Sequence, residues 1–129
     1  MKGNILLIEE SEVLRQSIVF MLTEEGFSVT LGSSLDDLPG LLNQGDFDLL
    51  IMDAHSSIGL GLQRLRKVQH QWTSAAVPVI IFHKDLDGAY EISLNESRNI
   101  RFIAKPFSKN VLRSVLRELL KRLHEKSAV

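Results

Sequence analysis

Residues 47–53 read FDLLIMD, an apolar run that ends in a carboxylate. The four apolar residues at 49–52 follow one another without polar alternation, which is typical of a central parallel strand covered on both faces. Such a strand would carry Asp53 to its carboxyl end. We therefore expect the sheet to be arranged around this strand, with its functional edge at Asp53.

Apolar runs on either side of this stretch predict four further strands, at residues 4–8, 27–31, 77–82 and 100–104. Helical patterns fill the intervals and predict helices at residues 12–25, 37–45, 62–72, 85–99 and 109–123. Strands that alternate strictly with helices imply parallel strands joined by right-handed crossovers. The predicted fold class is therefore α/β: a doubly wound, five-stranded parallel sheet with helices on both faces.

Composition limits the function classes. The chain has 129 residues, of which 44% are hydrophobic, enough for one domain with an ample core. We place that domain at residues 1–125 and treat residues 126–129 as a tail or linker stub. Fifteen Lys and Arg against sixteen Asp and Glu give a net charge of −1, so direct nucleic-acid binding by this domain is not expected. The absence of cysteine, signal peptide and membrane span favours a cytoplasmic protein.

Single residues predict where elements begin and end. Ser11 and Ser108 are predicted N-caps, because a serine hydroxyl accepts a hydrogen bond from a free N–H of the first helical turn. Gly26 supplies the left-handed residue that closes a helix. Pro78 must lie near the start of its strand to spare the ladder. Alternating polarity at residues 27–31 predicts a strand near the sheet's edge.

The last helix has two contrasting faces. Its predicted apolar stripe comprises Val111, Leu112, Val115, Leu116, Leu119, Leu120 and Leu123. Its predicted solvated face comprises Lys109, Arg113, Arg117, Lys121 and Arg122. A broad apolar stripe of this kind indicates an amphipathic helix that packs on the core.

Polar side chains follow the ends of four predicted strands, and in doubly wound sheets these ends form the ligand site. They are Glu9, Glu10, Asp53, His55, His83 and Lys105. Clustered carboxylates repel one another and need a hard, oxygen-binding cation and a fixed ammonium to remain ionised together. The sequence therefore predicts a cleft in which a divalent cation and Lys105 neutralise the carboxylates.

The acidic pair Glu9-Glu10, Asp53 and the motif Lys105-Pro106-Phe107, each at the end of its strand, resemble the receiver domain of response regulators. The resemblance spans essentially the whole chain and implies the sheet order 2-1-3-4-5. It implies that Asp53 accepts a phosphoryl group from a phosphohistidine on a sensor histidine kinase or phosphotransfer protein. Lys105 would contact the acyl phosphate. The protein would then be a signalling phosphoacceptor and not an enzyme with a separate substrate.

The resemblance also implies a magnesium site and a switch. Glu10, Asp53 and the backbone carbonyl of His55 would hold Mg²⁺, with Glu9 assisting through water. Phe102 would be the aromatic switch residue. The surface made by residues 85–99, the strand that carries Phe102 and the last helix is where receivers commonly dimerise or dock partners. Whether the receiver stands alone or is joined to a C-terminal effector domain stays open at this point.

Four departures from the family pattern indicate an atypical receiver. Both acidic positions carry Glu, which is one methylene longer than the usual Asp and can crowd a small octahedral cation. His83 stands where the family has Thr or Ser, so an imidazole would have to contact the phosphoryl group and act as the switch residue. Lys84 replaces the usual small residue that follows it, and Ser56-Ser57 replace the usual Met-Pro.

Two interpretations stay open at this point. In one, Asp53 is phosphorylated and His83 replaces the missing hydroxyl. In the other, the domain is a pseudo-receiver that binds a protein partner without phosphorylation. A third arrangement, in which His55 and His83 join the carboxylates to hold Mn²⁺ or Zn²⁺, is weaker, because histidines in loops commonly form local hydrogen bonds.

Overall fold

The computed structural model describes residues 2–32, 40–41, 46–53, 77–83 and 100–127, with side chains described up to residue 121. The described elements are five strands and two complete helices. The strands are β1 (Asn4–Ile8), β2 (Ser28–Gly32), β3 (Leu49–Asp53), β4 (Val79–His83) and β5 (Ile100–Ala104). The helices are α1 (Glu12–Glu24) and α5 (Lys109–Ser127).

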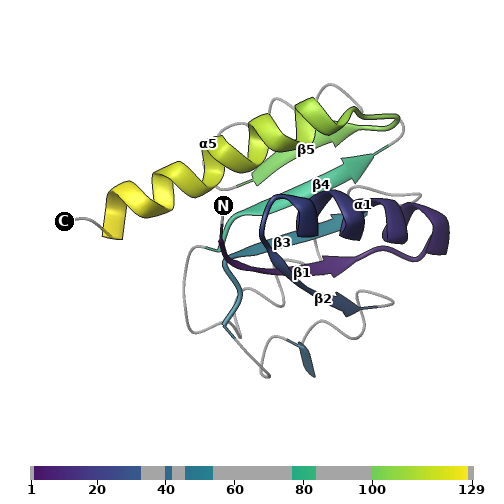
Figure 1. Ribbon diagram of the computed structural model, residues 1–129, viewed down its shortest axis with the longest axis horizontal. Helices are drawn as coiled ribbons and strands as arrows, with labels where there is room; N and C mark the ends of the chain where they lie inside the picture. The colour runs from purple at the N-terminus through teal and green to yellow at the C-terminus, as the bar shows by residue number, and fades with distance from the viewer. Residues whose placement is uncertain (1, 33–39, 42–45, 54–76, 84–99, 128–129) are drawn as a thin grey trace.

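The strands form one parallel sheet in the order β2-β1-β3-β4-β5 (Figure 1). The predicted fold and strand order are confirmed. β3 lies at the centre, and its five residues are all buried, as the unbroken apolar run at its core required. β2 lies at the edge and is mostly exposed or half-buried. The register pairs Asp53 with Phe82 and so brings the ends of β3 and β4 together.

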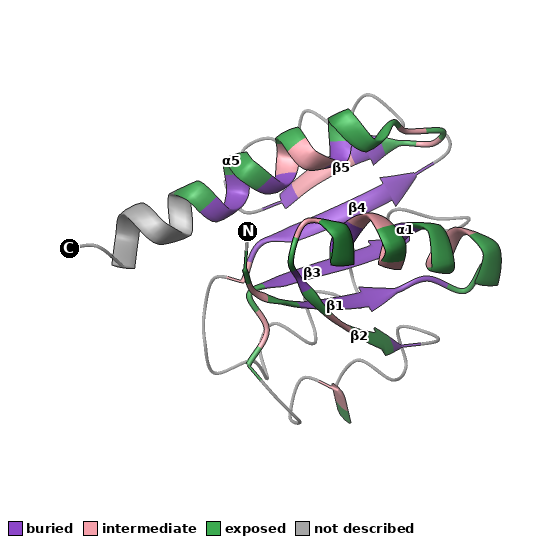
Figure 2. Ribbon diagram, viewed as in Figure 1, coloured by how far each residue is buried: buried purple, intermediate pink, exposed green. Residues whose placement is uncertain are grey.

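The core has two halves, one on each face of the sheet, because side chains alternate along each strand. On one face, α1 and α5 pack against the same set of strand residues, which includes Ile5, Ile51 and the fully buried Phe82. On the other face the described cluster includes Leu6 and Met52, with Phe102 packed against it. Figure 2 shows the buried central strands beneath the exposed outer surface of α1.

The predicted helix-end signals are confirmed. The Ser11 hydroxyl accepts from Leu14 N at 3.4 Å, and the Ser108 hydroxyl accepts from Val111 N at 3.1 Å. Gly26 closes α1 with a φ of 98°, a conformation that costs a side-chain-bearing residue energy.

Pro78 lies directly before β4, as predicted. Its carbonyl accepts a hydrogen bond from Leu50 N at 3.0 Å. The proline therefore joins the ladder as an acceptor, and its missing N–H costs the sheet nothing there.

Several boundaries differ from the prediction. β2 begins one residue later than expected, because the Phe27 N–H still bonds to the Leu22 carbonyl of α1. It ends at Gly32, where a Cβ would collide with the side chain of Ile8. β4 includes His83, and β3 begins at Leu49 and not at residue 47.

The apolar stripe predicted for α5 is narrower than expected. Val111 is 46% exposed, and that part of the prediction is wrong, because Val111 lies in the first turn and on the outer side of the helix. Leu112, Leu116, Leu119 and Leu120 are buried as predicted. The helix continues to Ser127, two residues beyond the point at which we placed the end of the domain.

Three predicted helices lie wholly or mostly outside the described residues. Of the helix expected at 37–45, only residues 40 and 41 are described, and both are helical. The helices expected at 62–72 and 85–99 lie outside the described ranges, as do His55, Ser56-Ser57 and Lys84. Within the described ranges, none of the helices combines the length and the apolar character that a membrane span requires.

Candidate functional site

Three charged side chains meet at the carboxyl edge of the sheet. Lys105 Nζ lies 3.1 Å from Asp53 Oδ1 and 3.5 Å from Glu9 Oε2. Glu9 directly follows β1, Asp53 ends β3, and Lys105 directly follows β5. Parallel strands bring their carboxyl ends to one edge, so three residues far apart in sequence converge there. One ammonium therefore serves two carboxylates.

The two carboxylates are unusually well buried. Glu9 is 1% exposed and Asp53 is 8% exposed. Glu9 also accepts a hydrogen bond from the Ser11 backbone N–H through Oε1, at 3.1 Å. These two carboxylates and the one ammonium together carry a net charge of one negative unit. Buried carboxylates are costly unless they are paired, and Lys105 pairs with both of them.

The backbone around Lys105 is fixed from two sides, on either side of a cis peptide bond to Pro106. The Lys105 N–H donates to the His83 carbonyl at 2.7 Å, which extends the contact between β4 and β5 by one residue. Two residues further, the Phe107 ring stacks on Phe82 at a centroid distance of 4.5 Å and an interplanar angle of 5°. The hydrogen bond and the stack thus hold the segment from which the lysine side chain extends.

His83 ends β4 and turns its ring towards Phe102. Its ring meets the edge of the Phe102 ring, with a centroid distance of 6.1 Å and an interplanar angle of 64°. The residue is 7% exposed, and within the described part of the chain Nδ1 has no hydrogen-bond partner. The two predicted switch residues are therefore in contact with each other, and a buried polar atom beside the site has an unused hydrogen-bonding capacity there.

The described residues meet only part of the predicted requirements of a metal site. Glu10 is exposed, while Glu9 is turned inward towards Lys105. No group of three or more His, Asp or Glu side chains is positioned to hold a metal ion in the ranges that the structure describes. The carboxylate oxygens of Glu9 and Asp53 are the hard donors that Mg²⁺ prefers. The donor chemistry fits the ion, and the fourth predicted donor, the His55 carbonyl, lies outside the described residues.

A doubly wound parallel sheet that gathers an aspartate, a second acid and a lysine at its carboxyl edge has the architecture of a receiver domain. The chain belongs to the response regulator receiver domain family, whose family model matches residues 5–117. The matched range includes every described residue of the site. The resemblance noted in the sequence is thereby confirmed at the level of the family.

Curated relatives include transcriptional regulatory proteins that are longer than this chain. The chain is 27% identical over 112 residues to the alginate biosynthesis transcriptional regulatory protein AlgB of Pseudomonas aeruginosa, a match that covers 87% of this chain and 24% of AlgB. It is 24% identical over 123 residues to the phosphate regulon transcriptional regulatory protein PhoB of Klebsiella pneumoniae, covering 95% of this chain and 54% of PhoB. The chain thus spans between about a quarter and about half of these relatives.

Solved structures agree on the fold. The receiver domain of the sensor histidine kinase PA1611 from Pseudomonas aeruginosa has a TM-score of 0.76 and 26% identity, over 94% of this chain and 99% of that one. That structure has a magnesium ion coordinated in its active-site cleft. A CheY-like receiver domain protein from Methanospirillum hungatei has a TM-score of 0.80 at 18% identity, over 98% of this chain and 99% of that one.

Two contributors to the site are not apparent in the sequence. The sequence indicates Ser11 only as a helix cap, and Phe107 only as part of a motif. The stack of Phe107 on Phe82 joins residues whose pairing no local pattern predicts. The Ser11 contact does have a sequence signal, because the N–H groups at a helix start are free to bind a carboxylate that precedes them.

Proposed function

We propose that this receiver domain accepts a phosphoryl group on Asp53. The observation that carries the proposal is the Lys105 ammonium, 3.1 Å from Asp53 Oδ1 at a buried sheet edge, in a chain of the receiver family. An ammonium held beside a carboxylate is positioned to stabilise the charge that develops on the equatorial oxygens during phosphoryl transfer.

In the proposed reaction a carboxylate oxygen of Asp53 attacks the phosphorus of a phosphohistidine on a sensor kinase or phosphotransfer protein. The P–N bond breaks, its electron pair stays with the donor imidazole, and an acyl phosphate forms on Asp53. Asp53 is itself the nucleophile and enters as a carboxylate, so no general base is needed. The domain therefore acts as a signalling phosphoacceptor, and we place the exchange in the cytoplasm.

We propose Mg²⁺ as the cation, held by Glu10, Asp53 and the His55 carbonyl, with Glu9 acting through water. When bound, the ion would neutralise charge on the phosphoryl oxygens. Glu9 and Asp53 offer buried carboxylate oxygens, and Glu10 is the exposed member of the set.

We further propose that His83 contacts the phosphoryl group and passes its presence to Phe102. Support comes from the ring contact between these residues and from Nδ1, which has no partner among the described residues. The response would appear on the surface formed by residues 85–99, β5 and α5, where a second copy or a partner would dock. Whole relatives such as PhoB are longer than this chain, which supports a C-terminal effector domain as the recipient of the signal.

The test is intact mass after incubation with a small phosphodonor and Mg²⁺. We expect wild-type protein to gain the mass of one phosphoryl group and Asp53→Asn to gain none. A wild-type protein that gains no mass under any divalent cation would overturn the proposal.

A pseudo-receiver is the second candidate, and one observation favours it. Lys105 already neutralises part of the charge at the site, and both oxygens of Glu9 have partners. A site in this arrangement has less need of a cation. In that case the domain would bind its partner equally well as wild type and as Asp53→Asn, with or without phosphodonor.

A further inference from the structure

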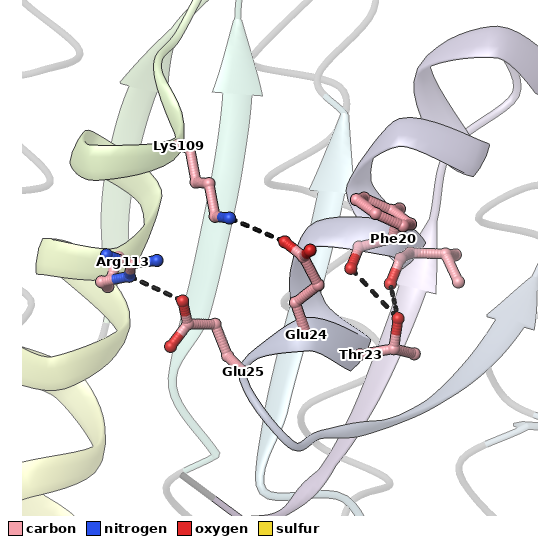
Figure 3. A network of polar contacts seen from close by, with 7 residues as sticks. Phe20, Thr23, Glu24, Glu25, Lys109 and Arg113 are labelled. Atoms are coloured by element: carbon pink, nitrogen blue, oxygen red, sulfur yellow. Dashed lines mark hydrogen bonds and ion pairs between the residues drawn. The ribbon is translucent and has the colours of Figure 1, made fainter.

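Two ion pairs join the last turn of α1 to the beginning of α5. Lys109 Nζ lies 2.6 Å from Glu24 Oε2, and Arg113 Nε donates to Glu25 Oε1, also at 2.6 Å. Figure 3 shows both basic side chains extending from α5 towards the two glutamates. The neighbouring Thr23 hydroxyl bonds back to carbonyls of its own helix and takes no part in these pairs.

Three of these charges, on Glu24, Glu25 and Lys109, lie at helix ends where the helix dipole disfavours them. Glu24 is the last residue of α1 and Glu25 is its C-cap, where the helix dipole is negative and favours a cation. Lys109 is the first residue of α5, where the dipole is positive and favours an anion. The last turn of α1 contains no basic residue and the first turn of α5 contains no acidic one. Each helix taken alone is therefore destabilised by its terminal charge.

The same charges become favourable when the helices dock. Each glutamate meets a cation from α5, and each cation meets an anion from α1. The buried leucines of α5, among them Leu112 and Leu116, hold the helix on the core but are non-directional. The ion pairs add a preference for one position of α5 along α1.

The first turn of α5 lies close to the site in sequence. Lys105 precedes Lys109 by four residues, and Phe107 and the Ser108 cap lie between them. A displacement of the first turn of α5 would pull on the segment that holds Lys105 against Asp53 and Glu9.

We propose that these two ion pairs form a charge latch, which fixes α5 on α1 and through it positions Lys105 at the acceptor edge. Glu24, Glu25, Lys109 and Arg113 are positioning residues in this account. The role of the latch in fixing α5 on α1 is argued only from contacts in the structure. Its effect on phosphoryl transfer depends on the proposed function.

The first experiment asks whether removing these charges lowers or raises the melting temperature. Glu24→Gln, Glu25→Gln and Lys109→Met each remove a charge that its own helix disfavours. Without a latch, these substitutions raise the melting temperature or leave it unchanged. With the latch, each lowers it by roughly 1–4 °C at low salt, since an exposed pair contributes only modestly, and the loss shrinks at about 1 M salt as screening takes over.

Matched variants control for net charge. Glu12→Gln removes an acid from the other end of α1, and Lys121→Met removes an exposed cation from further along α5. Neither should show a coupling with the latch residues. The double variant Glu25→Gln with Arg113→Met should lose less than the sum of its two single variants. Additive losses, or single variants that gain stability, would overturn the latch.

The second experiment measures whether the latch positions Lys105. The rate at which an amine-acetylating reagent modifies Lys105, followed by mass spectrometry, reports how often its ammonium leaves the two carboxylates. We expect Glu25→Gln to raise this rate roughly threefold through local opening. Ile80→Val, a buried change in β4 of comparable cost, should leave it unchanged. Equal rates in the two variants would overturn the positioning role, while the mass test of phosphoryl transfer would stand or fall separately.

Discussion

Among the described residues, lysine pairs with carboxylates at the carboxyl edge of the sheet and between α1 and α5, and these two regions differ in burial. At the sheet edge, the Lys105 side chain is 14% exposed and the partner side chains of Glu9 and Asp53 are 1% and 9% exposed. Between the helices, Lys109 is 46% exposed and its partner Glu24 is 41% exposed. The buried Lys105 is shared by two acids, whereas Lys109 pairs with Glu24 and Arg113 pairs with Glu25.

In the two regions the same pairing chemistry has different roles: the buried pairs form the proposed acceptor site, and the pairs between α1 and α5 hold α5 in position. Exposed pairs with equal numbers of charges contribute little and are weakened by salt. Two buried carboxylates that share one ammonium repel each other, and such local conflict between stability and composition is typical of functional sites. Substitutions in the two regions should therefore differ in the size, and even in the sign, of their effect on the unfolding free energy.

The largest effect is expected from Lys105→Met. The substitution leaves two buried carboxylates without their ammonium, and breaking a buried pair in this way costs about 3 kcal/mol of unfolding free energy. Urea unfolding in metal-free buffer measures it. A loss no larger than that of Lys109→Met would show that burial does not distinguish the two regions.

A gain in stability is expected from His83→Leu. The leucine has a similar volume and removes a buried imidazole whose Nδ1 lacks a partner among the described residues. An unsatisfied buried polar atom costs about 1–2 kcal/mol, so the unphosphorylated variant should be more stable by about that amount. If His83 contacts the phosphoryl group, phosphorylation should change the unfolding free energy of the wild-type protein but not that of His83→Leu. Chemical denaturation of both states checks the prediction, and a destabilised unphosphorylated variant would contradict it.

A smaller gain is expected from Asp53→Asn. The amide relieves the repulsion between the two buried carboxylates that share Lys105 and keeps the Lys105–Glu9 pair, for about 1 kcal/mol of added stability in metal-free buffer. Urea midpoints of the two proteins, compared at equal ionic strength, provide the measurement. A variant less stable than wild type would show that repulsion between Glu9 and Asp53 does not outweigh the Lys105–Asp53 pair.

The smallest effect is expected from Lys109→Met. An exposed pair contributes about 0.5 kcal/mol, and the loss should disappear at high salt. The buried pair at Lys105 should retain most of its contribution under the same conditions. Unfolding free energies of Lys109→Met and Lys105→Met, measured over a series of salt concentrations, test this difference. Equal salt dependence in the two variants would show that burial does not distinguish the two regions.

The fold could be predicted from the sequence because its signals are local. The apolar run that ends in Asp53, the Ser11 cap and the closing Gly26 each report on a few neighbouring residues, and the alternation of elements then restricts the topology. The residues at the sheet edge could be predicted for the same reason. Once the strands are parallel, the residue after each strand is at that edge.

What the sequence could not show depends on direction and distance in space. Glu9 and Glu10 are neighbours in the sequence, but only the structure shows that Glu9 turns inward to Lys105 while Glu10 stays exposed. The contact between the rings of His83 and Phe102 likewise appears only in three dimensions. The pairs between α1 and α5 join residues separated by 85 and 88 positions, which no local pattern connects.

The central claim is that Asp53 receives the phosphoryl group, and the most direct measurement is to trap the modified residue chemically. Borohydride reduces an acyl phosphate to the alcohol, so a phosphorylated aspartate becomes homoserine and can be located by peptide sequencing in a mass spectrometer. After incubation with phosphodonor and Mg²⁺, we predict homoserine at position 53 in wild-type protein and a sharply reduced yield in Lys105→Met. Homoserine at another position, or none in wild-type protein that has gained the phosphoryl mass, would contradict the account.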